Sequence, residues 1–150
     1  MSGQQRRPRS AVEHGPTAQT VAAGVQRMRK RRGLSTYQLS AALEKAGRPI
    51  AASAIAKVER GERQVGVDEL MALAFVLDTP PSALLLPLED SPDATIEITG
   101  AGTVSAEVAW DWLDGRRPLL ASENFGRPGS HDRLAHVLYS RPPIRGDREA

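Results

Sequence analysis

The sequence lacks cysteine and long apolar runs, and each absence excludes a class of protein. Without cysteine there is no disulfide, no thiolate chemistry and no cysteine-ligated zinc. The longest apolar stretches, residues 70–77 and 83–86, are far shorter than the roughly 20 residues of a membrane-spanning helix. We therefore expect a cytoplasmic protein with no membrane partner, which folds as one domain or as one domain with a small appendage.

Basic residues are absent from residues 67–115, although the whole chain has a net charge of +2. That segment holds ten acidic residues, whereas residues 1–66 hold thirteen Lys and Arg against four Asp and Glu. Residues 116–150 hold seven basic and four acidic residues. A basic half joined to an acidic half favours an oriented encounter with a polyanion such as nucleic acid. The alternative is chance clustering of charge on a solvated surface.

Composition and periodicity divide the chain into five segments. Residues 1–17 are polar, rich in Arg and aperiodic, which predicts a disordered basic arm. Residues 18–86 form the main domain, residues 87–94 are a linker, residues 95–140 are a small C-terminal unit, and residues 141–150 are a disordered tail.

Five helices are predicted in residues 18–86 from apolar residues at helical spacing. The first spans residues 18–32, the second is capped by Ser35 and Gln38 as a capping box, and the third spans residues 52–60. The fourth begins near residue 67 and the fifth ends at residue 85. The expected inward-facing residues are Val21, Val25 and Met28, then Leu39 and Leu43, then Ile55 and Val58, and finally Val67, Leu70, Leu73, Ala74 and Leu77.

The C-terminal unit predicts a strand, a turn and a short helix. Residues 95–99 alternate as a strand does, residues 100–102 indicate a turn, and Ser105 is placed to cap a helix over residues 106–114. That helix has two apolar sides, which predicts burial against two different surfaces. One side carries Val108 and Trp112, and the other carries Ala106, Trp110 and Leu113. Both surfaces lie within the monomer, or one belongs to a second subunit or a partner. A further short helix is predicted over residues 134–139.

The third predicted helix has the features of a helix that enters the major groove of DNA. A reading helix needs small or hydrogen-bonding side chains on its outer face and cations beside the phosphates. The outer face here carries Ala52, Ser53, Ala56 and Lys57, and Arg60 lies at its end, where a phosphate would be. Ser35 and Thr36 place a hydroxyl and backbone N–H groups at the start of the second helix, and such helix ends bind phosphate.

Residues 20–86 resemble the lambda-repressor-like, Xre-type helix-turn-helix family, in the branch common in actinobacteria. The resemblance is carried by Gly33, Leu34, Ser35, Leu39, Leu43, Gly47, Arg48, Pro49, Ile50, Ser53, Ala54, Ile55, Lys57, Glu59, Gly61, Arg63, Val67, Asp68, Glu69 and Leu70. It implies a mainly α fold, in which a five-helix helix-turn-helix domain precedes the strand–turn–helix appendage.

The chain departs from this family at three places. Thr36 stands where the family usually has Gln, and Ala51 stands where a Ser or Thr often caps the third helix. The turn between the second and third helices is also longer than in compact members. The resemblance further implies an ion pair between Arg29 and Glu59, although a solvated Glu59 is the alternative that sequence leaves open.

These features predict a sequence-specific transcription regulator that binds double-stranded DNA as a homodimer on a palindromic site. The alternative is an antitoxin or a protein–protein adaptor whose residues 95–140 bind a partner protein. No enzymatic activity, metal or cofactor is expected. His14, His131 and His136 are scattered, and His131 and Asp132 have no nucleophile or glycine-rich loop beside them.

Overall fold

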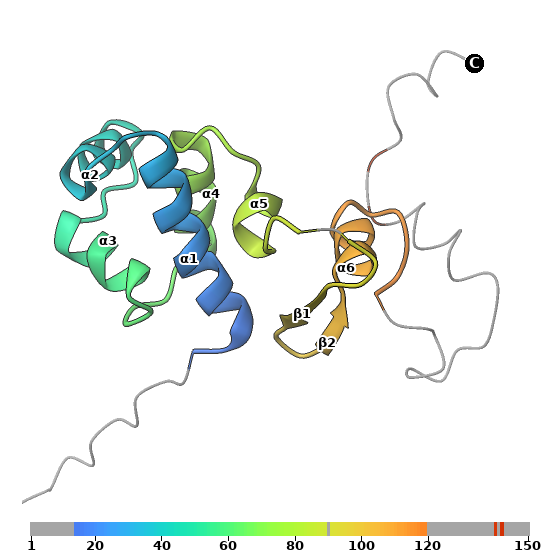
Figure 1. Cartoon of the computed structure of the whole chain (residues 1–150). Coiled ribbons are helices and arrows are strands. Elements are labelled where there is room, and N and C mark those ends of the chain that lie inside the picture. The colour runs from blue at the N-terminus through green and yellow to red at the C-terminus, as the bar shows by residue number, and fades with distance from the viewer. Residues whose placement is uncertain (1–13, 90, 120–139, 141, 143–150) are drawn as a thin grey trace, which may run out of the picture.

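The computed structural model describes residues 14–89 and 91–119, together with residues 140 and 142. Its elements are α1 (Pro16–Arg31), α2 (Thr36–Lys45), α3 (Ala52–Glu59), α4 (Val67–Val76), α5 (Pro81–Leu85), β1 (Thr95–Ile98), β2 (Gly102–Ser105) and α6 (Ala106–Leu113). Helices α1–α5 pack together, and the β1–β2 hairpin with α6 forms a smaller unit beside them (Figure 1). The fold is mainly helical, as predicted.

Three predicted segments lie outside the described residues. They are the arm before residue 14, the short helix over residues 134–139, and the tail after residue 142.

The core of the first unit lies between α1, α2, α3, α4 and α5. The predicted inward-facing residues of the first three helices are all buried, namely Val21, Val25, Met28, Leu39, Leu43, Ile55 and Val58. On α4, Leu73, Ala74 and Leu77 are buried and Leu70 packs against the same cluster. The prediction for Val67 is wrong, because its side chain is 80% exposed. Val67 lies on the same side of α4 as Met71 and Phe75, about a sixth of a turn away from Leu70.

The helix boundaries follow local capping chemistry. Ser35 and Gln38 form the predicted capping box, in which the Gln38 N–H donates to Ser35 Oγ at 3.1 Å and the Ser35 N–H donates to Gln38 Oε1 at 2.8 Å. Helix α1 begins at Pro16, two residues before the predicted start. Proline suits that position because the first helical N–H needs no intrahelical acceptor. The predicted boundary of the disordered arm at residue 17 is therefore wrong, because residues 16 and 17 belong to α1.

The C-terminal unit is a hairpin covered by one short helix. Strands β1 and β2 are antiparallel, with Thr95 opposite Ser105 and Ile98 opposite Gly102. Strand β2 was not predicted, because only three residues separate the predicted turn from the predicted helix, which is too few to show an alternating pattern. Ser105 precedes α6 but makes no side-chain capping bond, so the predicted cap is wrong.

Helix α6 packs on the hairpin through small residues, not through its tryptophans. Ala106 and Ala109 are fully buried in a cluster with Ile96 and Ile98, and the two tryptophans are partly buried around that cluster. Trp110 and Trp112 lie on either side of the alanine stripe, so both reach the same cluster. The expectation of two different surfaces is wrong for the two tryptophans. Because the side chains between them are alanines, the large indole rings on both sides can reach the same cluster.

The two units are connected by buried residues and by hydrogen bonds. Leu86, which composition assigned to the first unit, is buried in the second unit's cluster. The Trp110 indole N–H donates to the Pro87 carbonyl at 3.1 Å. At the other side, the Thr17 N–H donates to Thr99 Oγ1 at 3.2 Å and the Thr99 N–H donates to Thr17 Oγ1 at 3.0 Å. The hairpin therefore contacts the first turn of α1.

Candidate nucleic-acid interface

The outer face of α3 carries the residues that the sequence singled out. Ser53, Lys57 and Arg60 are exposed and occur at the i, i+4, i+7 spacing of one helical face. Ala52 and Ala56 lie beside them and are half-buried. On the opposite side, Ile55 and Val58 anchor the helix in the core. The structure thus brings all five predicted residues of this helix to the same outer region.

The start of α3 is an uncapped helix terminus. Ala51 makes no side-chain capping bond, as its methyl group predicts. The N–H groups of Ala52, Ser53 and Ala54 have no acceptor among the described residues. The entry of the chain is fixed instead by Ser40 of α2, whose hydroxyl donates to the Ile50 carbonyl at 2.7 Å. A group of open N–H donors at the end of an exposed helix suits a negatively charged ligand.

The start of α2 offers fewer donors than the sequence indicated. Both the N–H and the hydroxyl oxygen of Ser35 are engaged in the capping box. The N–H groups of Thr36 and Tyr37 have no acceptor within the part of the chain that the structure describes. The backbone at Thr36 and Tyr37, together with the Ser35 hydroxyl hydrogen, is what remains for an anion.

Arg29 of α1 and Glu59 of α3 form a two-point ion pair. Arg29 Nε donates to Glu59 Oε1 at 2.5 Å and Nη2 donates to Oε2 at 2.8 Å. The third nitrogen, Nη1, donates to the Leu34 carbonyl at 2.8 Å. The side chains are only 13% and 5% exposed, and the hydrogen bond to Glu59 raises the pKa of Arg29. Glu59 therefore presents no acid on the outer face of α3.

Arg60 is not an isolated cation, which the sequence did not predict. Its guanidinium donates two hydrogen bonds to Glu62, at 3.0 and 3.1 Å. Both side chains are about half exposed. The same contact lowers the pKa of Glu62. Lys57, by contrast, makes no ion pair or side-chain hydrogen bond with any described residue.

The loop after α3 is held by a third two-point ion pair. Arg63 donates to Glu69 at 3.0 and 2.7 Å, and the Gly66 N–H donates to Glu69 Oε2 at 3.1 Å. The hydrogen bond from Arg63 lowers the pKa of Glu69, and the bond from Gly66 lowers it further. Glu69 therefore ties the end of the loop to the first turn of α4.

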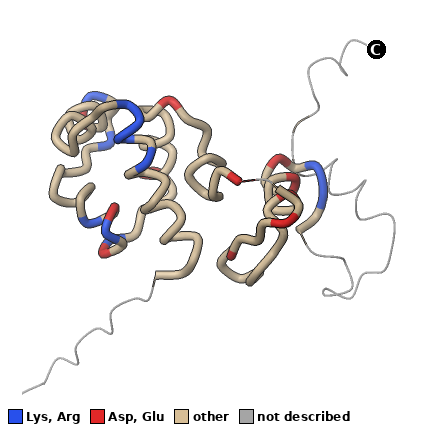
Figure 2. Tube along the Cα trace, viewed as in Figure 1, with Lys and Arg blue, Asp and Glu red and all other residues tan. Residues whose placement is uncertain are grey.

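Charge is separated between the two units. Lys and Arg lie over α1, α2 and α3, whereas Asp and Glu predominate in the hairpin and α6 (Figure 2). Sequence reasoning did not single out Tyr37, which is 79% exposed on the first turn of α2. It also passed over Lys30 and Arg31, which are exposed at the end of α1. No motif marks these three residues. Only their position in the last turn of α1 or the first turn of α2 could have indicated them.

In a helix-turn-helix domain, two consecutive helices pack so that the second buries its inner face and exposes a polar outer face. Helices α2 and α3 have this arrangement. Residues 25–84 match the family model described as helix-turn-helix, so this part of the chain is similar to the Xre-type, lambda-repressor-like DNA-binding domains. A search of curated proteins found no match, and neither did a search of solved structures.

The described residues place two further limits on the site. No helix within residues 14–89 and 91–119 is long and apolar enough to cross a membrane. In the same ranges, no group of three or more His, Asp or Glu side chains is arranged to hold a metal ion.

Proposed function

We propose that this protein is a sequence-specific, non-enzymatic transcription regulator that reads the major groove of DNA through α3. The observation that carries the proposal is the outer face of α3 within a helix-turn-helix domain. That face presents Ser53 and Lys57 in an exposed row, with small alanines beside them and open N–H groups at its start. Such a face can approach base edges closely and donate hydrogen bonds to them.

Each residue of the interface has a distinct proposed role. Lys57 and Ser53 hydrogen-bond to base edges, while Ala52 and Ala56 allow the helix to lie deep in the groove. Arg60 contacts a phosphate once it leaves Glu62, and the start of α2 at Ser35 and Thr36 contacts another. Thr36 offers one hydroxyl where a Gln amide would offer more, so the backbone N–H groups supply most of that second contact.

The acidic unit supports a single orientation on DNA. The hairpin and α6 carry Glu97, Glu107, Asp111 and Asp114, and phosphate repels such a surface. The basic unit therefore faces the duplex and the acidic unit faces away. We further propose a homodimer on a palindromic site, whose half-sites would lie about 34 Å apart.

The test is to select binding sequences from a random duplex library with the full chain, and then to measure affinity against salt. Each phosphate contact should add roughly −0.9 to the slope of log K against log salt. We expect an enriched motif and a slope of log K against log salt that corresponds to several phosphate contacts. An affinity that does not change with salt, or a library without an enriched motif, would contradict the proposal.

A second role, as an adaptor or antitoxin, is favoured by the separate hydrophobic cluster of the C-terminal unit. A small unit with its own core and an acidic surface can capture a basic protein partner. Under this role, Lys57→Ala would weaken DNA binding and leave binding of the protein partner unchanged. A Glu107→Lys variant of the wild-type chain would weaken binding of the protein partner and leave DNA binding unchanged.

A further inference from the structure

Helix α4 carries a row of large apolar side chains that the described residues leave uncovered. Val67, Met71 and Phe75 are 80%, 55% and 78% exposed and occur at i, i+4 and i+8. We call these three residues the α4 stripe. The other side of α4 is buried in the core through Leu73 and Leu77. The helix therefore has two apolar sides, and only one of them is covered within the described chain.

The other exposed large apolar residues do not form a row. Within the described ranges they are Tyr37 on α2 and Leu88 after α5, and each belongs to a different segment. Isolated exposed apolar residues are common in folded proteins, whereas a continuous row marks a contact surface.

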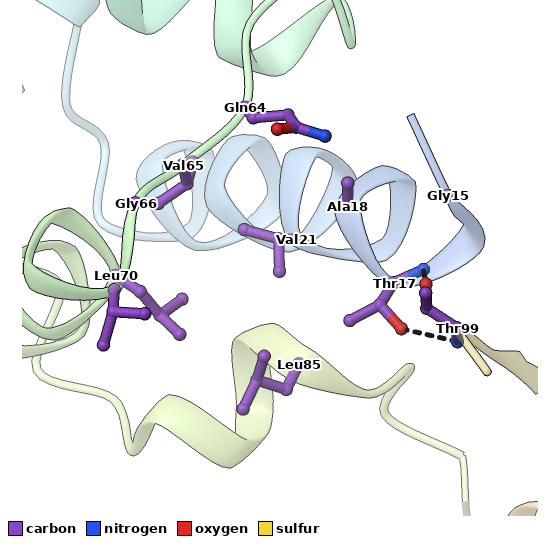
Figure 3. Close-up of a pocket in the computed structure, with 11 residues that line it drawn as sticks. Gly15, Thr17, Ala18, Val21, Gln64, Val65, Gly66, Leu70, Leu85 and Thr99 are labelled. Atoms are coloured by element: carbon purple, nitrogen blue, oxygen red, sulfur yellow. Dashed lines mark hydrogen bonds between the residues drawn. The ribbon is translucent and has the colours of Figure 1, made fainter. Parts of the chain in front are cut away.

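A cavity of about 410 Å³ lies at the Val67 end of the α4 stripe. Val67 itself lines it, together with Val21, Val65, Leu70 and Leu85, and no charged side chain takes part. Figure 3 shows that Val21, Leu70 and Leu85 point into this space, with the Thr17–Thr99 hydrogen bonds at one edge. An uncharged apolar cavity suits an aromatic or aliphatic side chain.

We propose that the α4 stripe is the interface with a second copy of this chain. Two α4 helices lie antiparallel about a two-fold axis that passes close to Met71. In that arrangement Phe75 of each copy lies over Val67 of the other and enters the cavity beside it. The stripe is self-complementary because Met71 lies at its centre and the cavity and Phe75 lie at opposite ends. A two-fold interface requires this property, since each patch must match itself.

The charges at the ends of the stripe suit a second copy of the same chain. Beside its start, Arg48 lies 3.8 Å from Asp68, and beyond its end Arg32 lies 2.7 Å from Asp78. Each end thus carries one positive and one negative side chain. Pairing two copies in either orientation places a mixed pair against a mixed pair, where Arg and Asp can exchange partners without an unpaired charge. The charges therefore complement a second copy, and the position of Phe75 relative to the cavity selects the antiparallel orientation. A parallel pairing would align the apolar residues but leave Phe75 far from the cavity.

The stripe by itself supplies about half of the area of a standard dimer interface. The three exposed side chains offer on the order of 400 Å², and a standard interface buries about 800 Å² on each partner. The walls of the cavity and the two flanking ion pairs supply the remaining contact. Phe75 in the partner's cavity is then the central anchor, as aromatic residues in pockets usually are.

This inference deepens the dimer that forms part of the proposed function, but its test uses no DNA. The absence of cysteine means that a single introduced thiol marks one position without ambiguity. We would prepare the full chain with Met71→Cys and treat it with a short thiol-specific cross-linker. Tyr37→Cys is the matched control, because Tyr37 is as exposed as Phe75 but lies on another helix. We expect covalent dimers from Met71→Cys and few from Tyr37→Cys.

The antiparallel orientation has its own test. Val67→Cys and Phe75→Cys chains should cross-link to each other when mixed, and more than either does alone. Equal cross-linking at Tyr37 and Met71 would overturn the interface. Cross-links of Val67→Cys only with itself would overturn the antiparallel arrangement.

Analytical ultracentrifugation provides an independent measurement without added thiols. We expect Phe75→Ser to raise the dimer dissociation constant at least tenfold and Tyr37→Ser to leave it unchanged, with circular dichroism showing that both variants fold. A wild-type chain that stays monomeric at its highest soluble concentration would overturn the inference. DNA binding by that monomer to one half-site would leave the function proposed for α3 standing.

Discussion

Arg29 of α1 and Glu59 of α3 are joined by two parallel hydrogen bonds of 2.5 and 2.8 Å. The same guanidinium also binds the Leu34 carbonyl in the turn before α2. One side chain therefore fixes the relative positions of α1, the start of α2 and the end of α3. It also neutralises the one acid on α3, which would otherwise repel phosphate.

Breaking this pair from either side should destabilise the fold. Glu59→Gln or Arg29→Gln leaves a mostly buried partner without its counter-charge, so each variant should lose about 2–4 kcal/mol of unfolding free energy. The double variant should lose less than the sum of the two, because the interaction is removed only once. Urea denaturation of the four proteins measures this coupling.

The matched control is Glu62→Gln, which removes a two-point pair of the same geometry between exposed side chains. Its unfolding free energy should hardly change. Additive effects of the Arg29 and Glu59 variants would show that the two residues do not depend on one another.

Lys57→Ala should weaken DNA binding and relax the choice of base at one position. The expected loss is about 1–3 kcal/mol for the selected site and little for other sequences. Arg60→Ala should weaken all sequences to a similar extent and reduce the salt slope by about one contact. Binding profiles of both variants on a set of single-base-pair variants would separate the two roles.

Arg116→Ala is the control for a general loss of positive charge. Arg116 is exposed and, like the acids that it pairs with, lies in the C-terminal unit rather than on α3. It should leave the affinity nearly unchanged. Identical specificity profiles for Lys57→Ala and Arg60→Ala would refute the assignment of base and phosphate roles.

Glu62→Gln should strengthen DNA binding. Glu62 now holds the Arg60 guanidinium and adds a negative charge beside it. Replacing the carboxylate releases Arg60 for a phosphate and removes a repulsion, so affinity should rise several-fold at low salt and less at high salt. Fluorescence anisotropy at two salt concentrations measures the change.

Glu107→Gln removes an exposed acid from α6 instead and is the matched control. It should have a smaller effect, because the proposed orientation places α6 away from the duplex. An equal gain from both variants would mean that only net charge matters.

The contribution of Glu69 to stability should depend on pH below its ordinary pKa of 4.5. Arg63 lowers the pKa of Glu69 in the folded chain, so the unfolded chain binds the proton more readily. The stabilisation is therefore complete above about pH 5 and declines as the pH falls below 4.5. Wild type should exceed Glu69→Gln by about 1 kcal/mol at pH 7, and the difference should vanish in acid.

Chemical denaturation between pH 3 and pH 7 would follow this difference. A constant difference over the whole range would show that Glu69 acts through packing rather than through its charge.

The sequence by itself determined the features that depend on short-range spacing. The apolar periods that bury Val25, Leu39 and Ile55 and the capping box of Ser35 involve residues within one or two turns, so they can be recognised locally. The family resemblance added the Arg29–Glu59 pair, which spacing alone could not indicate.

Only the tertiary structure decided which of two apolar sides of a helix is covered. Val67 fits the inward period of α4, yet the neighbouring helices bury Leu73 and leave Val67 exposed. The Thr17–Thr99 bonds join residues 82 positions apart, and no local pattern predicts such a contact. Burial depends on which surfaces meet after the chain has folded, whereas helix formation depends on neighbours a few residues away.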